Sequence, residues 1–250
     1  MVWSYSRITA FEDCPYRFFL KYIKLVPSEQ KFFASYGSFM HRILEHYAQG
    51  ELARAELLPY YLSHFLQAVP QKAPSAKVFT NYFKQGADYL GGTLNLPAQT
   101  LTSERNYEFS IGPRRFVGIV DLVCGDGDLC IVDHKSHDLK PRSRRSKPTK
   151  QDAELDRYLR QLYLYSLPVE QEFGKTPSHL CFNCFRQQRF IQEPFREQQR
   201  EDAISWALDT IDQIEQTEEW APNIEPFKCR HICDVEHCCE WVQLYGGGHF

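Results

Sequence analysis

The chain has 250 residues, of which 43% are hydrophobic, 24% charged and 14% aromatic. This composition supports a core of ordinary size and excludes a chain that is disordered throughout. The formal net charge of −3 gives no overall attraction to nucleic acid, so any such binding must use a local basic patch. No apolar run reaches the roughly 18 residues of a membrane span, and no apolar signal-peptide core stands at the N-terminus. We therefore expect a soluble protein of the cytoplasm.

Helical spacing of apolar residues dominates the first part of the chain. Residues 3–24 are predicted to form two helical stretches, separated by a turn where Pro15 follows Cys14. Further helices are expected at 37–49, 51–69 and 78–90.

The pattern then changes to short runs rich in β-branched and aromatic residues. Strands are predicted at 103–111, 116–124, 128–134 and 178–186, with helices at 151–167 and 197–217. This order indicates an α/β fold, in which a small mixed sheet is flanked by helices. We expect one domain over residues 1–250, made of a helical N-terminal extension (1–95), a core (100–220) and a cysteine-rich tail (221–250).

Two of the predicted strands meet at a Gly-Asp-Gly-Asp turn, and each carries an aspartate between apolar neighbours: Asp121 in the first and Asp133 in the second. A buried carboxylate is costly unless a cation or hydrogen-bond donors compensate its charge. A two-residue turn would place the aspartates on opposite faces, whereas an odd loop centred on Gly127 pairs them on one face. We predict the odd loop. Because side chains alternate along a strand, Asp133 and Lys135 also share a face.

These two carboxylates and the lysine suit phosphodiester hydrolysis. Carboxylate oxygens hold Mg²⁺ or Mn²⁺, which can activate water and stabilise charge on the phosphate. Lys135 can orient the attacking water or neutralise charge in the transition state. The alternative is an exposed hairpin with a plain salt bridge between Asp133 and Lys135. Residues that could complete the site are Glu104 on the preceding strand, His41 on the 37–49 helix, and Gln161 and Tyr165 on one face of the 151–167 helix.

The nine cysteines are an odd number, and they are unevenly spaced. Four crowd near the C-terminus: Cys229, Cys233, Cys238 and Cys239. In a reducing compartment such a group indicates metal or iron–sulfur ligation rather than disulfides. The cysteines expected to pack in the core are Cys181 and Cys184, in a strand-like run, and Cys124 and Cys130, beside the hairpin turn.

A basic segment separates Lys135 from the next helix. Six of the eleven residues at 140–150 are Lys or Arg and none is acidic. Such a loop attracts phosphate backbones without reading sequence, although it could equally be a solvated loop that is disordered without substrate. The candidate DNA-binding residues in it are Arg142, Arg144, Arg145 and Lys147.

The motifs together resemble the RecB-like branch of the PD-(D/E)XK nucleases, over most of the chain. The matching segments are Ser6-Arg7-Ile8 with Cys14-Pro15-Tyr16-Arg17-Phe18, Gly37-Ser38-Phe39-Met40-His41 (Gly-x-x-x-His), Gly118-Ile119-Val120-Asp121 (Gly-x-(Ile/Val)-Asp), Asp133-His134-Lys135 (Asp-x-Lys) and Gln161-Leu162-Tyr163-Leu164-Tyr165 (Gln-x-x-x-Tyr). The resemblance implies a restriction-endonuclease-like core.

The resemblance also implies roles for these residues. Metal ligands would be His41, Asp121 and Asp133, with Lys135 catalytic. Gln161 and Tyr165 would contact or position DNA. Glu104 fits the acidic position in the strand before Asp121, with Glu108 as a competing candidate.

A subset of this family, including helicase-linked nucleases and CRISPR adaptation exonucleases, is similar in having one early and three late cysteines around a [4Fe–4S] cluster. By this resemblance the ligands are Cys14, Cys229, Cys233 and Cys239, and Cys238 could replace Cys239. The Cys229–Cys233 interval is one residue longer than is usual in the family. Zinc, with His231 or His237 as nitrogen ligands, is the alternative. The partners implied are DNA and, in such systems, a helicase or CRISPR adaptation proteins.

We therefore expect a metal-dependent DNA exonuclease acting on single-stranded or frayed ends. The alternatives are a structure-specific DNA endonuclease on the same core and a non-catalytic DNA-binding subunit. The sequence has no phosphate-binding Gly-x-x-x-x-Gly-Lys-Ser loop, so any unwinding must come from a partner.

Overall fold

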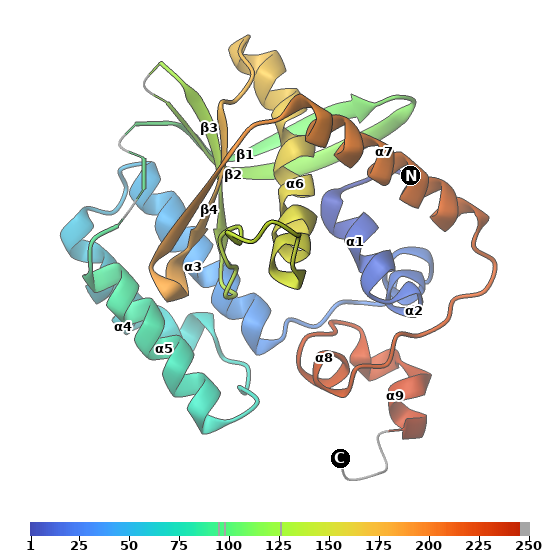
Figure 1. The fold of residues 1–250 in the computed structure, drawn as a ribbon. Helices are drawn as coiled ribbons and strands as arrows, with labels where there is room; N and C mark the ends of the chain where they lie inside the picture. Colours follow the sequence, from blue (N-terminus) through green and yellow to red (C-terminus); the bar gives the residue numbers. More distant parts are fainter. Residues whose placement is uncertain (95, 98, 126, 246–250) are drawn as a thin grey trace.

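The structure is a computed structural model that describes residues 1–94, 96–97, 99–125 and 127–245 (Figure 1). Its described residues form a five-stranded sheet in the order β1-β2-β3-β4-β5. The strands are β1 (Thr100–Ile111), β2 (Arg114–Gly125), β3 (Leu129–Lys135), β4 (His179–Cys184) and β5 (Arg189–Pro194). Neighbouring strands are antiparallel except β3 and β4, which are parallel because a helix crosses over between them. The predicted α/β class with a small mixed sheet is confirmed.

Helices cover both sides of this sheet (Figure 1). Those of the N-terminal part are α1 (Tyr5–Asp13), α2 (Pro15–Phe18), α3 (Phe32–Ala48), α4 (Leu57–Ala68) and α5 (Ala76–Gly91). Those that follow β3 are α6 (Lys150–Phe173), α7 (Glu197–Gln216), α8 (Pro226–His231) and α9 (Glu240–Tyr245). Figure 1 shows α3, α4 and α5 gathered on one side, and α1, α6 and α7 on the other.

The predicted turn at Cys14 is confirmed. Ser4 caps α1 by accepting a hydrogen bond from the Arg7 backbone N–H at 3.2 Å. Cys14 is extended, with φ −164°, and its thiol accepts from the Arg17 N–H at the start of α2. Pro15 occupies the first position of α2, where its missing N–H costs nothing. A π-helical turn, Phe19–Ile23, continues α2.

The β2–β3 hairpin has the predicted odd register. Leu122 pairs with Val132 and Gly125 with Leu129, which leaves the three loop positions 126–128. Asp126 lies outside the described residues, but Gly127 has φ +91°, a conformation that favours glycine. Continued by one step, this register sets Asp121 opposite Asp133. The two aspartates therefore come from adjacent points of neighbouring strands.

Some element boundaries differ from those predicted. The helix expected at 37–49 begins at Phe32, and that expected at 51–69 begins at Leu57, after a 3-10 turn at Arg54–Glu56. The helix expected at 151–167 runs on to Phe173 and ends at Gly174, which has φ +65°. The predicted 178–186 strand ends at Cys184, and β5 was not predicted at all. The chain reverses there through a 3-10 turn, Phe185–Gln187.

Two apolar clusters hold these layers together. The larger joins the sheet to α1, α6 and α7, through side chains such as Ile8, Leu159 and Ile211. The second is formed by α3, α4 and α5 and includes Phe39 and Tyr61. The carboxylates of β2 and β3 lie where α3 meets the sheet, so both clusters support the candidate site. Within the described residues, none of the helices combines the length and apolar character that a membrane crossing requires.

Candidate active site

Three carboxylates lie side by side across β1, β2 and β3. The β1–β2 register sets Glu104 opposite Asp121, as the β2–β3 register sets Asp121 opposite Asp133. Regular pairing is broken at this level: Glu104 has φ +44°, a strained conformation for a residue with a side chain. The backbone N–H of His134 donates to Asp121 Oδ2 at 2.6 Å. The sheet therefore opens locally, at the row of carboxylates.

His41 adds an imidazole from α3. Its Nε2 lies 3.0 Å from the carbonyl oxygen of His134, to which it donates. Its Nδ1 lies 3.6 Å from Glu104 Oε1 and 3.5 Å from Asp121 Oδ2. The ligand atoms of these three side chains all lie within 4.8 Å of one another. Oxygen and imidazole donors at this spacing fit a divalent cation, and a second ring nitrogen bonded to a carbonyl is the usual arrangement of a metal-binding histidine.

Asp133 stands beside this group rather than in it. Its Oδ2 forms an ion pair with Lys135 Nζ at 2.7 Å. Apart from that ion pair, this buried oxygen has no hydrogen-bond partner among the described residues. The tight group of ligand atoms is thus His41, Glu104 and Asp121, whereas the resemblance had implied Asp133 in place of Glu104. The Asp133–Lys135 salt bridge exists, but it is buried and not on an exposed hairpin face.

The charges in the site are strongly coupled. Burial lowers the pKa of His41, but the charge of Asp121 and the hydrogen bonds of Asp121 and Glu104 together raise it to about 10. Burial raises the pKa of Asp121, and the charge and hydrogen bond of His41 bring it down to about 2. Burial raises the pKa of Asp133 to about 6; Lys135 opposes the rise and Asp121 adds to it. The crowded carboxylates repel one another when ionised, and the positive charge of a divalent cation would offset that repulsion.

Lys135 is oriented by two residues of α6. Its Nζ donates to Gln161 Oε1 at 3.1 Å, and Gln161 Nε2 lies 3.4 Å from the hydroxyl of Tyr165. The ring of Tyr165 packs against Gly118, where a Cβ would lie only 2.4 Å from Tyr165 Cε1. This close approach explains the glycine three residues before Asp121. Since Tyr165 is 7% exposed, these contacts support positioning over direct DNA contact.

A cleft of about 570 Å³ opens beside the site. It is lined by Phe33, Ala34, Gly37, Ser38, His41, Arg42, Glu45, Glu104 and Ser136. The sequence reasoning did not single out Arg42, although it follows His41 directly. Its guanidinium makes no hydrogen bond or ion pair with the described residues, so it can meet a ligand in the cleft.

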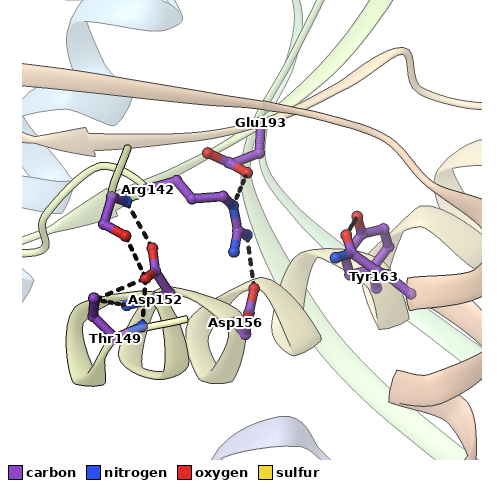
Figure 2. Close-up of polar contacts among 8 residues, drawn as sticks. Arg142, Thr149, Asp152, Asp156, Tyr163 and Glu193 are labelled. Atoms are coloured by element: carbon purple, nitrogen blue, oxygen red, sulfur yellow. Dashed lines mark hydrogen bonds and ion pairs between the residues drawn. The ribbon is translucent and has the colours of Figure 1, made fainter. Parts of the chain in front are cut away.

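The basic segment after β3 is anchored at both ends. Arg142 bridges Glu193 on β5 and Asp156 on α6, with N–O distances of 2.8 and 2.7 Å (Figure 2). Its charge is thus satisfied within the protein. Of the four candidate DNA-binding residues in the segment, Arg144, Arg145 and Lys147 stay exposed.

Asp152 closes the other end of this segment, and we expect Asp152→Ala to release it. The carboxylate accepts hydrogen bonds from the N–H and hydroxyl groups of Ser143 and Thr149 (Figure 2), and these bonds lower its pKa. A carboxyl with a lowered pKa stabilises the folded loop above its unfolded pKa of about 4. That stabilisation is lost as the pH falls through the lower pKa of the folded state. At neutral pH, trypsin should cleave Asp152→Ala faster at 144–147. Asp202→Ala, at an exposed position of α7, is the control. Equal cleavage rates of the two variants would contradict this anchoring.

Several cysteines of the C-terminal tail face the N-terminal turn. Burial raises the pKa of Cys239, and the nearby Cys14 and Cys229 raise it further. Burial likewise raises the pKa of Cys233 to about 11, with Cys239 contributing. Cys238 is exposed, and the other cysteines are buried or half-buried, as predicted: Cys124, Cys130, Cys181 and Cys184. Cys14, Cys229, Cys233 and Cys239 are thus neighbours, and no disulfide joins them.

Polar and aromatic contacts also join the tail to the N-terminus. Asp234 forms ion pairs with Arg17 at 2.8 Å and Lys21 at 2.5 Å. Trp220 stacks on Phe18 and Phe19, with ring centroids 5.7 and 5.6 Å away. Further contacts are Lys31–Glu236 at 2.9 Å and Tyr16–Glu240 at 2.7 Å. These contacts place the tail against the N-terminal turn, whereas the predicted joining through a cluster at Cys14 stays a prediction.

Comparison with known proteins agrees with this geometry. The sequence profile of the PD-(D/E)XK nuclease superfamily matches residues 2–240. No curated protein matches the chain significantly. A crystal structure named "putative exonuclease", from Eubacterium rectale, superposes with a TM-score of 0.55 at 12% identity, covering 99% of this chain and 94% of the other. The structure of SSO0001 covers 74% of this chain and 79% of its own at 18% identity, but its TM-score of 0.28 carries no weight.

The profile match spans nearly the whole chain. The fold, a five-stranded mixed sheet flanked by helices, agrees with it. The acidic residues and the lysine of its Asp-x-Lys strand lie together at one point of that sheet. The chain belongs to the PD-(D/E)XK nuclease superfamily.

Proposed function

We propose that this protein is a divalent-metal-dependent deoxyribonuclease that hydrolyses phosphodiester bonds at single-stranded or frayed DNA ends. The observation that carries the proposal is the convergence of His41, Glu104 and Asp121 beside the buried pair of Asp133 and Lys135. Superfamily membership supports nuclease chemistry. The exonuclease mode and the DNA substrate rest on the RecB-like motifs.

The chain's own residues divide the work of hydrolysis. His41, Glu104 and Asp121 would hold Mg²⁺ or Mn²⁺, which, when bound, supplies charge stabilisation at the phosphate and lowers the pKa of water. Lys135 Nζ lies 2.7 Å from Asp133 Oδ2, the carboxylate that the register sets beside Asp121. Burial lowers the pKa of Lys135, but the charge and hydrogen bond of Asp133 together with the charge of Asp121 raise it on balance, so the group stays charged. The ammonium group can hold the attacking water by a hydrogen bond donated from Nζ and stabilise the negative charge that develops on the phosphate.

The surroundings of the site suit a single strand. The cleft next to His41 has Arg42 free to meet a phosphate and Phe33 to offer an apolar wall. The exposed side chains of Arg144, Arg145 and Lys147 add positive charge near the end of β3. Phosphate contacts of this kind bind without sequence preference and weaken as salt rises.

The experiment that tests the proposal is cleavage of end-labelled DNA by anaerobically purified protein, with Mg²⁺, Mn²⁺ or EDTA. We expect degradation only with a metal, faster on single-stranded than on blunt duplex DNA, with products that shorten one nucleotide at a time. A few discrete internal products would indicate an endonuclease. Equal cleavage of RNA would contradict the DNA assignment, and no cleavage with any metal would indicate a binding subunit.

We propose further that Cys14, Cys229, Cys233 and Cys239 hold a [4Fe–4S] cluster. Cys14 and Cys229 both contribute to the raised pKa of Cys239, and Cys239 contributes to that of Cys233, which supports the proximity of the four thiols. No three of them among the described residues come within 4.8 Å of one another. Zinc, held with bonds of about 2.3 Å, is the alternative metal for these thiols, and the metal content of the purified protein separates the two.

We expect anaerobically purified protein to contain about four irons per chain and a visible absorption band. Cys14→Ser and Cys239→Ser should both lose the iron, since each removes a ligand from one of the two chain ends. Cys238→Ser is the matched control, because its thiol is exposed beside Cys239 and should be dispensable. Iron lost in Cys238→Ser but kept in Cys239→Ser would reverse the last assignment, and bound zinc in place of iron would reject the cluster.

A further inference from the structure

One peptide unit orients two of the candidate metal ligands. The N–H of His134 donates to Asp121 Oδ2 at 2.6 Å, and the carbonyl oxygen of the same residue accepts from His41 Nε2 at 3.0 Å. The position of residue 134 therefore sets both the direction of the Asp121 carboxylate and the ring plane of His41. A shift of this residue would move both ligands at once.

The side chain of His134 is held by a buried amide. Asn183, its partner in the parallel β3–β4 register, places Nδ2 at 3.0 Å from His134 Nδ1 and at 2.8 Å from the hydroxyl of Tyr89. All three side chains are buried. Because an amide nitrogen carries two N–H groups, one can serve each partner, and His134 Nδ1 then accepts.

An asparagine at this point needs a physical reason. Its strand neighbours Phe182 and Cys184 are buried and apolar, and a polar amide between them is costly unless its hydrogen bonds are made. Here both of its N–H groups reach partners, one on β3 and one on α5. A second link runs parallel to the first: Arg186 bonds both Gln85 on α5 and the carbonyl oxygen of Ser136. The strand that carries the site is thus tied to α5 on both sides of Lys135.

We propose that Asn183 is a positioning residue of the metal site, acting through His134 and backed by Tyr89. It fixes the one residue whose N–H and carbonyl groups orient Asp121 and His41. The inference rests on the proposed function, since it assumes that these two side chains bind a divalent cation. Residues that orient metal ligands from behind change metal affinity by about 10- to 100-fold when removed.

The test is Mn²⁺ binding, measured by calorimetry on the full chain without DNA. Asn183→Leu should bind Mn²⁺ about 10- to 100-fold more weakly than the wild type. Its cleavage should need correspondingly more Mn²⁺ but recover most of its rate at saturation. Thr210→Val is the matched control: it also removes a buried hydrogen bond, on α7, away from the site. Both variants should melt a few degrees lower, and only Asn183→Leu should lose metal affinity.

Tyr89→Phe gives a second, milder variant should Asn183→Leu fail to fold. It removes only the hydroxyl that Asn183 contacts, and a smaller loss of Mn²⁺ affinity in the same direction is expected. Wild-type affinity in a folded Asn183→Leu protein, or in Tyr89→Phe if that is the variant that folds, would overturn the inference while leaving the nuclease proposal intact. A wild type that binds no Mn²⁺ would overturn the metal site and this inference together.

Discussion

Asp121→Asn is expected to reduce DNA cleavage by about a thousandfold or more while the protein stays folded. Asp121 is the carboxylate that meets His41 Nδ1 and also accepts from the His134 N–H. An amide keeps the shape but removes the negative charge that draws a divalent cation. Losing several kcal/mol of metal-dependent stabilisation corresponds to roughly a thousandfold in rate.

The control for this prediction comes from β1. Glu104→Gln should also lose most activity, because Glu104 belongs to the same tight group of ligand atoms. Glu108→Gln should retain activity, since the Glu108 side chain is 79% exposed and, among the described residues, forms an ion pair with Arg115 alone, at 3.8 Å. Both measurements are single-turnover cleavage rates at saturating Mn²⁺, with circular dichroism to confirm folding. Full activity in Asp121→Asn would remove the carboxylate row from the mechanism, and equal losses in both glutamate variants would leave the choice between them unsupported.

Much of this site could be predicted because the hairpin leaves few choices. Only an odd loop sets Asp121 and Asp133 on one face, and Gly127 permits the positive φ that such a loop needs. Strand alternation then places Lys135 beside Asp133. The fold class followed from the order of helical and strand patterns. This order does not change when the predicted end of a helix or strand is wrong by a few residues.

The metal group itself was only partly predictable. Alternation puts Glu104 and Glu108 on equal terms, and neither propensity nor spacing reveals that Glu104 adopts φ +44° at a break in the ladder. That distortion turns its carboxylate toward His41. The contribution of His134 could not be predicted for another reason. Its backbone, rather than its side chain, contacts the ligands, and any residue type can make such backbone contacts.

Two other features were missed for lack of local signals. The turn before β5 has Gln188 at φ +49°. A glycine or asparagine at that position would have indicated a chain reversal in the sequence. Arg142 looked like its basic neighbours, yet tertiary contacts with Glu193 and Asp156 occupy its guanidinium. In both cases, long-range packing decided what the local composition left open.

Lys135→Met is expected to lower the cleavage rate by about 10²- to 10³-fold, as does removal of one donor that stabilises transition-state charge. It should also destabilise the protein by about 3 kcal/mol at neutral pH, because Asp133 is left buried without its partner. Lys135 lowers the pKa of Asp133, so its loss must raise that pKa further above about 6. A carboxyl with a raised pKa costs stability as the pH rises from its unfolded value of about 4 through its folded value.

The extra instability of Lys135→Met should therefore appear above pH 6 and shrink toward pH 4, which urea unfolding at several pH values can measure. Lys140→Met is the matched control: its ammonium group is exposed and, within the described part of the chain, pairs with Asp138 alone, so stability and cleavage should both stay near wild type. Assayed at a temperature where every variant is folded, cleavage by Lys135→Met should remain low at each pH. A rate that recovers in step with stability would mean that Lys135 only supports the fold, whereas a loss that persists assigns its charge to the reaction.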